Sequence, residues 1–322
     1  MNLPRRNKKK RHDSKPTLEL IDEAFCLVRS APAWLSTSYL IGTVPFVLGM
    51  IYFWSDMSRS AFAERRCLEF SLALALLFFW MKIFQAVYAR GLRAIAAGRM
   101  INWSLRRIAR MVVTQVCLQP YGIIAIPLSM IVAFPLPAVH AFYQNLSAME
   151  EQDHETVRAY AARAWKQAKL WPTQSGIIVW LLSPWMLGVG LIISFWIASL
   201  FISYIMPLGL YSDLAWFFIA LLLVYYSVFP FAPFSCIVAA NIAVAIYALP
   251  LLLKMLFGVE STFTTSGWHT ICNTTYIMAV FALAYICLDP LSKAAHALRC
   301  YYGDAIKSGE DLLKDLEQEV KK

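Results

Sequence analysis

The sequence predicts an all-α fold: a polytopic helical membrane bundle of about six transmembrane helices, with a proline-rich re-entrant hairpin and cytoplasmic amphipathic helices. Of the 322 residues, 59% are hydrophobic and only 15% are charged. The apolar residues gather into runs of about 20, which is the length that one helix needs to cross ~30 Å of hydrocarbon. One run carries four prolines. A chain this apolar would expose large apolar patches in water, so we expect an integral membrane protein.

The N-terminal segment differs from the rest of the chain in composition. Residues 1–16 are basic and have almost nothing to bury, which predicts a disordered tail. Residues 17–30 carry apolar side chains on one helical face and charged side chains on the other, so we expect a helix lying in the membrane interface. No apolar run follows the basic residues before Pro32. The order of a cleavable signal peptide is therefore missing, and we expect the N-terminus to be retained.

Six apolar runs are predicted to span the membrane. They cover about residues 33–54, 67–89, 176–203, 214–230, 232–257 and 274–288. The last run is short for a full crossing and needs help from its flanking residues. Residues 17–290 thus form one membrane domain. Residues 291–322 return to mixed charge with helical periodicity, which predicts a cytoplasmic amphipathic helix.

The run 111–142 contains Pro120, Pro127, Pro135 and Pro137, which we interpret as hairpin breaks. An interior proline removes a helical hydrogen bond and costs ~3 kcal/mol or more. If this run crosses once, the basic block 150–171 is exported, against the positive-inside rule. If the run enters and returns on one side, that block, the arginine-rich block 90–110 and both termini stay in the cytoplasm. We therefore predict a re-entrant hairpin; the alternative is a kinked ordinary span.

Several stretches resemble known bacterial proteins. TLELIDEAFCLVRSAPAWL and RCYYGDAIKSGEDLLKDLE resemble the first helix and the tail of six-helix proteins related to the membrane domain of some glycerophosphodiester phosphodiesterases. FYQNLSAME, RAWKQAKLWP, LPLLLKMLFGVESTFTTSG, CNTTY and LDPLSKAAHALRCYYG resemble an uncharacterised bacterial family of multi-span membrane proteins. The resemblance covers nearly the whole chain after residue 17. It implies a multi-pass inner-membrane protein with both termini cytoplasmic, and it implies no reaction.

Four polar residues in or beside apolar runs form a candidate intramembrane polar site: Glu69, Lys82, His140 and Asn241. An ionisable group at membrane depth is costly, so its presence points to function. Each residue also has a structural explanation. Glu69 and Lys82 can anchor the helix at the interface, with the lysine stem reaching toward water. Asn241 can hydrogen-bond to another helix, and a lone His140 is usually a satisfied polar residue.

The sequence offers no catalytic, metal or cofactor motif. The seven cysteines are scattered, and the acidic cluster at 150–155 fits a solvated helix start, since consecutive helical positions point different ways. The net charge of +9 lies beside apolar runs, which indicates contacts with anionic lipids of the bilayer and no nucleic acid. We therefore expect no cofactor and no enzyme.

Two functions remain open. The first is a non-enzymatic scaffold or assembly partner in an envelope complex, in which 17–30, 150–171 and 291–320 dock membrane or cytoplasmic proteins. The alternative is a transporter or lipid-handling protein with a polar site at the broken-helix hairpin, because broken helices at midplane serve that purpose in transporters.

Overall fold

The computed structural model describes residues 15–99, 103–132, 136–152, 154–183, 233–258 and 273–309, together with residues 186 and 199. All the secondary structure in this part of the chain is helical, which confirms the all-α class. The chain divides into two compact units. The first unit is drawn from Met1–Phe46, Ala75–Ile178 and Pro290–Lys322, and the second from Val47–Leu74 and Val179–Asp289.

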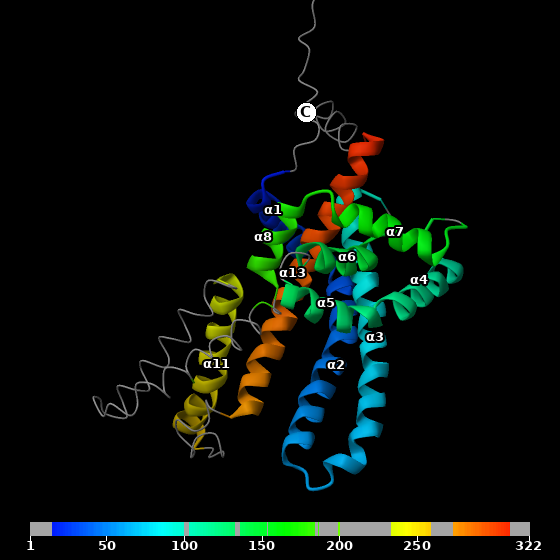
Figure 1. The fold of residues 1–322 in the computed structure, drawn as a ribbon. Helices are drawn as coiled ribbons and strands as arrows, with labels where there is room; N and C mark the ends of the chain where they lie inside the picture. Colours follow the sequence, from blue (N-terminus) through cyan, green and yellow to red (C-terminus); the bar gives the residue numbers. More distant parts are fainter. Residues whose placement is uncertain are drawn as a thin grey trace, which may run out of the picture. The chain divides into compact units, whose positions relative to one another are not determined.

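Four of the described helices are long and apolar enough to cross a membrane, in agreement with the prediction of a multi-pass membrane protein. They are α2 (Ala33–Arg59), α3 (Ala63–Ala97), α11 (Pro233–Phe257) and α13 (Thr274–Ser308) (Figure 1). The pair α4 and α5, described below, makes a fifth if the two helices count as one bent span. Of the other predicted spans, 214–230 and most of 176–203 lie outside the described residues.

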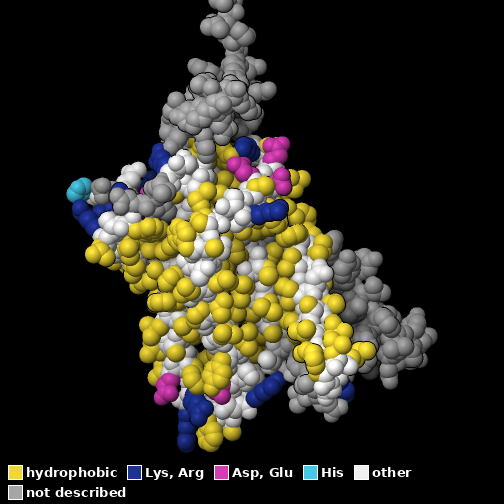
Figure 2. Space-filling model, turned by 180° about the vertical axis from the view of Figure 1, so that it is seen from behind, with side chains coloured by type: hydrophobic (Ala, Val, Ile, Leu, Met, Phe, Trp, Pro, Cys, Tyr) yellow, Lys and Arg dark blue, Asp and Glu magenta, His cyan; other side chains and the backbone are white. Residues whose placement is uncertain are grey.

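The apolar helices turn large side chains outward. On α3, Leu68, Leu72 and Leu76 are 80%, 64% and 63% exposed, and their spacing of four residues places them on one helical face. Hydrophobic side chains cover most of the visible surface of the described helices (Figure 2). Such a surface is expected where the surroundings are lipid.

Small residues allow α2 and α3 to approach closely within the first unit. A Cβ atom added at Gly42 would lie 2.3 Å from Cβ of Phe84, and one added at Gly91 would lie 2.5 Å from Cδ1 of Leu35. Trp80 Nε1 donates to the carbonyl of Ile41 at 3.1 Å. Close approach through glycine is the usual way for membrane helices to pack, because the side chains give no hydrophobic driving force in lipid.

The run 111–142 is divided among three helices: α4 (Leu105–Leu118), α5 (Pro120–Val132) and α6 (Leu136–Ala148). The chain bends by 43° between α4 and α5. Pro120 opens α5 and Pro137 is the second residue of α6, positions where the missing N–H costs little. Pro127 lies inside α5, and Pro135 lies outside the described residues.

The described residues include three further, shorter helices. They are α1 (Thr17–Ser30), α7 (Val157–Ala168) and α8 (Pro172–Leu182). The side-chain oxygen of Thr156 accepts from the N–H of Ala159 and so caps α7. Helix α6 packs against both α5 and α7. Helix α1 occupies the range in which the sequence predicts an interfacial helix, and it buries Leu20, Ile21, Ala24 and Leu27.

The C-terminal helix differs from the prediction. The sequence predicts that the last span ends near Leu288 and that a separate cytoplasmic helix begins after Pro290, but α13 runs without interruption from Thr274 to Ser308 with Pro290 inside it. Leu288 and Leu291 are buried on either side of the proline. The burial of this helix offsets the local cost of Pro290. Residues 291–300 are all buried, so this stretch is core and not a free docking surface.

Candidate functional site

The first unit has a polar interior. Its buried polar side chains include Gln85, Arg90, Thr114, Gln115, Gln119, His140, Asn145, Ser147, Gln167, Gln174, Lys293, His296 and Arg299. A water-soluble domain keeps most such groups at its surface, because burying a polar group is costly unless it is hydrogen-bonded. Several of these residues belong to two groups, which we call the hairpin clasp and the cationic centre.

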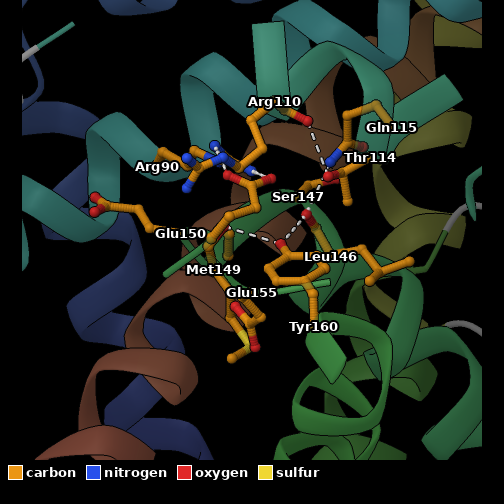
Figure 3. Close-up of polar contacts among 12 residues, drawn as sticks. Arg90, Arg110, Thr114, Gln115, Leu146, Ser147, Met149, Glu150, Glu155 and Tyr160 are labelled. Atoms are coloured by element: carbon orange, nitrogen blue, oxygen red, sulfur yellow. Dashed lines mark hydrogen bonds and ion pairs between the residues drawn. The ribbon is translucent and has the colours of Figure 1, made fainter. Parts of the chain in front are cut away.

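The hairpin clasp consists of Arg90, Arg110, Gln115, Gln119, Ser147, Glu151 and Tyr160. Figure 3 labels five of them: Arg90, Arg110, Gln115, Ser147 and Tyr160. Its strongest member is the ion pair between Arg90 and Glu151. Nη1 of Arg90 lies 2.9 Å from Oε2 of Glu151, and Nη2 lies 2.6 Å from Oε1. The two side chains are only 5% and 6% exposed. This two-bond geometry is the strong form of an arginine–carboxylate pair, and it connects α3 to the chain between α6 and α7.

Further hydrogen bonds of the clasp connect the two ends of the segment 105–152. Arg110 Nη1 donates to the carbonyl of Gln152 at 3.0 Å, and Gln115 Nε2 donates to the carbonyl of Leu146 at 2.9 Å. Gln119 Nε2 lies 3.3 Å from Oγ of Ser147. Helix α4, at the start of the segment, is therefore bonded to its last helix and to the loop that follows it.

Tyr160 of α7 completes the clasp at the C-terminal end of α6. Its hydroxyl lies 2.8 Å from the carbonyl oxygen of Leu146 and 3.0 Å from that of Met149. The last carbonyls of a helix have no partner within the helix, so side chains must satisfy them when they are buried. Burial of the phenol raises the pKa of Tyr160, so it remains a hydrogen-bond donor at neutral pH.

We expect Tyr160→Phe to lower the free energy of unfolding by about 1–2 kcal/mol, because buried carbonyls lose their donor while the ring is retained. Thermal unfolding in detergent measures the change. Tyr121 is 67% exposed, so Tyr121→Phe is the matched control and should stay within about 0.5 kcal/mol of the parent. Equal effects of the two substitutions would contradict the role of the Tyr160 hydroxyl.

The cationic centre consists of Lys82, His140, Gln144, Lys293, His296 and Arg299. Lys293, His296 and Arg299 follow one another at intervals of three residues on α13, which places them along one side of the helix. Lys293 Nζ donates to Oε1 of Gln144 at 3.1 Å, and the rings of His140 and His296 have centroids 5.5 Å apart. Four buried nitrogen-bearing side chains thus meet between α6 and α13.

The hydrogen bonds of Arg299 fix the tautomer of its neighbour. Its guanidinium can only donate, and Nη1 lies 3.3 Å from Nδ1 of His296. The ring nitrogen Nδ1 is therefore the acceptor, so the proton of neutral His296 sits on Nε2. Among the described residues, neither this Nε2 nor Nδ1 of His140 has a hydrogen-bond partner. A buried polar atom without a partner costs about 1–3 kcal/mol.

The surroundings of His140 disfavour its charged form. Burial is the largest cause, and the positive charges of Lys293, Lys82 and Arg299 act in the same direction, which lowers the pKa of His140 to about 3. The imidazole is therefore neutral throughout the physiological range. The positive charges of Lys293, Lys82 and Arg299 thus all act on His140, and they disfavour a further positive charge there.

The same shift predicts a dependence of stability on pH. An unfolded histidine titrates near 6.5, so below that pH the unfolded chain binds a proton that folded His140 excludes. Stability should fall as the pH drops from about 6.5 toward 3, by about 1 kcal/mol per pH unit. Thermal unfolding at pH 7.5, 6.0 and 5.0 should show a shallower fall for His140→Asn than for the parent. Identical slopes would contradict this contribution of His140.

The structure distributes the four polar candidates over both units. Lys82 and His140 belong to the cationic centre of the first unit, whereas Glu69 and Asn241 belong to the second. Glu69 is exposed. Asn241 is also exposed, and its Nδ2 donates to the carbonyl of Ile237 in its own helix at 2.8 Å. The sequence-based expectation of a hydrogen bond from Asn241 to another helix stays untested, because much of the second unit lies outside the described residues.

Sequence reasoning missed Lys293, His296 and Arg299, because it assigned 291–322 to a cytoplasmic amphipathic helix. The signal available was their three-residue spacing within a stretch otherwise rich in alanine and leucine. It also treated the acidic cluster at 150–155 as solvated. In the structure Glu151 pairs with Arg90, and Oε1 and Oε2 of Glu155 lie 3.0 and 2.7 Å from Arg163 nitrogens.

The described residues contain no group of three or more His, Cys, Asp or Glu side chains placed to hold a metal ion. Comparison with known proteins gives no relative. No protein-family model, no curated protein and no solved structure matches this chain. The function is therefore inferred from the site itself.

Proposed function

We propose that this protein is a multi-pass membrane protein of the transporter or lipid-handling class, which binds an anionic ligand at the cationic centre. The observation that carries this proposal is the burial of Arg299 and Lys293 beside two histidines, each of which has a ring nitrogen without a partner in the described part of the chain. A ligand with negative charge and hydrogen-bonding oxygens would supply a counter-charge for Arg299 and a partner for the two ring nitrogens.

The guanidinium of Arg299 is a buried positive charge. Moving a guanidinium out of water costs several kcal/mol unless a counter-charge compensates. Within the described residues Arg299 has no acidic partner: it donates to Oε1 of Gln174 at 3.1 Å and to the carbonyl of Trp171 at 3.4 Å. The acid nearest to Lys293 on its helix is Asp289, one turn before it. An anion beside α13 would provide the counter-charge that Arg299 does not have among the described residues.

The imidazoles of His296 and His140 offer further polar contacts to an anionic ligand. The Nε2–H of His296 can donate to an anionic oxygen. His140 lies beside it and is neutral at physiological pH, so it adds a polar contact without adding charge. A phosphate-type group, which offers several acceptor oxygens, suits such a set of donors. It can belong to a lipid headgroup or to a soluble anion.

Binding measurements on the purified protein test the proposal. Thermal stabilisation by inorganic phosphate and by a short-chain phosphatidylglycerol should be compared in neutral detergent, because a bound ligand raises the apparent stability. Stabilisation by at least one of them is expected for the parent and should fall at least tenfold in apparent affinity in His296→Gln and Arg299→Gln. Lys166 is exposed on α7, so Lys166→Gln is the control for loss of one positive charge and should bind like the parent.

The ligand that stabilises the protein identifies the source of the anion. Response to phosphate favours a soluble anion, and response to the lipid alone favours a headgroup. No response to either, or equal binding by the parent and His296→Gln, would overturn the proposal. His296→Gln retains a neutral side chain of similar length, so it serves as the informative variant if Arg299→Gln does not fold.

The topology belongs to the same proposal. We place the segment 105–152 as a re-entrant hairpin, with both termini in the cytoplasm of a bacterial inner-membrane protein. Support comes from the hydrogen bond of Arg110 to Gln152, which joins the two ends of the segment. Ser147 is buried and is unsuitable for labelling. The exposed positions Ser104 and Glu150 are suitable instead.

Cysteine labelling from one side of the membrane distinguishes the two topologies. With exposed native cysteines replaced, Ser104→Cys and Glu150→Cys should react from the same side if the segment returns, and from opposite sides if it crosses once. Ala61→Cys, in the exposed turn between α2 and α3, is the control for the far side. Reaction of Ser104→Cys and Glu150→Cys from opposite sides would reject the hairpin.

A scaffold role is the second candidate, and one surface favours it. On α1, Leu18 is 72% exposed and Phe25 is 46% exposed, and their spacing of seven residues places them on one side. A cytoplasmic or membrane protein partner could cover this pair. Crosslinking in cells followed by mass spectrometry should recover a partner from the parent and lose it in Leu18→Ser/Phe25→Ser. Recovery that is unchanged in this variant would count against docking at α1.

A further inference from the structure

The first unit has a second surface, which shares no residue with the cationic centre and suits a different kind of partner. Helices α4 and α5 expose a continuous series of large apolar side chains: Leu105, Val113, Val116, Tyr121, Ile123, Ile124 and Leu128. Their exposed fractions run from 39% at Val116 to 87% at Leu105. We call this series the α4–α5 face.

The opposite side of α4 is polar and buried. Thr114 and Gln115 are 2% and 1% exposed, and Gln119, at the end of the helix, is 3% exposed. All three side chains are hydrogen-bonded within the first unit: Thr114 to the carbonyl of Arg110, Gln115 to that of Leu146, and Gln119 to Ser147. The second half of α4 is therefore amphipathic in the inverted sense: Thr114 and Gln115 are buried, whereas Val113 and Val116 are exposed. Such an arrangement is favoured where the surroundings are apolar.

Positive charge marks one end of the α4–α5 face. Arg106 and Arg107 are exposed in the first turn of α4, beside Leu105. No aspartate or glutamate occurs between residues 103 and 132, so this stretch carries only positive charge. A surface that begins with arginines and continues with apolar side chains is complementary to an anionic phospholipid leaflet, with phosphates at one level and acyl chains below it.

The length of α5 limits how far the face can reach. The helix has 13 residues, which corresponds to about 20 Å at 1.5 Å per residue. This is less than the ~30 Å of a bilayer's hydrocarbon core. The 43° bend before Pro120 also turns α5 away from the direction of α4. Helix α5 alone is therefore too short to cross, whereas α4 and α5 together are long and apolar enough to form either one bent span or a re-entrant pair.

We propose that the α4–α5 face is a binding surface for anionic phospholipid in a single leaflet, with Arg106 and Arg107 at the phosphates and Ile124 and Leu128 among the acyl chains. This proposal goes beyond the ligand site at the cationic centre, with which it shares no residue; its placement in a single leaflet rests on the re-entrant topology proposed above.

Spin-label depth measurements test the placement of the face. Nitroxides at Leu105→Cys, Val113→Cys and Ile124→Cys are introduced one at a time into the full chain in phosphatidylcholine vesicles containing phosphatidylglycerol. Accessibility to oxygen relative to a water-soluble nickel reagent should rise from position 105 to 124. Full accessibility of position 124 to the nickel reagent, or immobilisation without access to either reagent, would overturn the proposal.

Lipid retention tests the role of the charges. Native mass spectrometry should detect phosphatidylglycerol retained over phosphatidylcholine by the parent, with that preference reduced at least threefold in Arg106→Gln/Arg107→Gln and kept in Arg106→Lys/Arg107→Lys. Arg158 and Lys166 are exposed on α7, so Arg158→Gln/Lys166→Gln is the control with the same change of charge. A preference that is unchanged in Arg106→Gln/Arg107→Gln, or equally reduced in the control, would reject recognition of anionic lipid by this face.

Discussion

Arg90→Met is expected to lower the free energy of unfolding by about 3–5 kcal/mol, the largest effect that we predict for a single substitution. The reason is the position of Glu151, which is 6% exposed and bonded to both Nη atoms of Arg90. Removal of the arginine leaves a buried carboxylate without its counter-charge. Thermal unfolding in detergent, followed by helix content, measures the loss.

Two further variants separate the ion pair from other effects of Arg90. Arg90→Met/Glu151→Leu removes both charges and should recover much of the lost stability, because a buried pair contributes little beyond an apolar pair of similar volume. Lys15 and Glu23 form an exposed pair at 3.1 Å, so Lys15→Met is the surface control and should cost at most about 1 kcal/mol. A double variant as unstable as Arg90→Met would show that the unpaired charge is not the cause.

Gly42→Ala is expected to cost about 1–3 kcal/mol, although alanine favours helices by ~1 kcal/mol over glycine. The added Cβ would lie 2.3 Å from Cβ of Phe84. That atom is attached directly to the backbone of α3, so it cannot rotate away, and α2 and α3 must separate. A decrease in the melting temperature measures the effect.

Gly176→Ala is the matched control for this prediction. Gly176 also lies inside a helix, α8, but the nearest atom to an added Cβ there is Cγ of Pro137 at 3.8 Å, an ordinary contact. The substitution should be neutral or stabilise the protein by up to about 1 kcal/mol. If both substitutions lower the melting temperature equally, close contact of α2 and α3 at Gly42 is not the reason.

The helices themselves were predictable because their signal is local. A run of about 20 apolar residues predicts a helix long enough to cross a membrane, and α2, α3 and α11 occupy the residues where such runs lie. The end of the last helix was not predictable in this way. Pro290 has a local cost that the sequence displays, whereas the compensating burial of residues 291–300 depends on segments that are distant along the chain.

The candidate site was predictable only in part for a similar reason. Lys82 and His140 stand out because each is a titratable group in or beside an apolar run. Lys293, His296 and Arg299 lie in a stretch whose mixed composition is equally typical of a solvated helix. Only packing against α6 distinguishes a buried helix from a solvated one here. The contacts of Lys293 with Gln144 and of His296 with His140 show this packing. The partner of Glu151 is likewise 61 residues away at Arg90.

The central place of α13 in the first unit has a consequence for synthesis. Gln167 reaches the carbonyls of Arg299 and Cys300 at 3.4 Å, across 132 and 133 residues. A ribosome delivers α2, α4 and α7 to the bilayer well before it delivers their buried neighbour. Until then α13 cannot pack against the polar sides of the early helices. Water, lipid headgroups or an insertion factor must provide their hydrogen bonds. Closure of the unit is thus a late event that joins segments translated early to one that is translated much later.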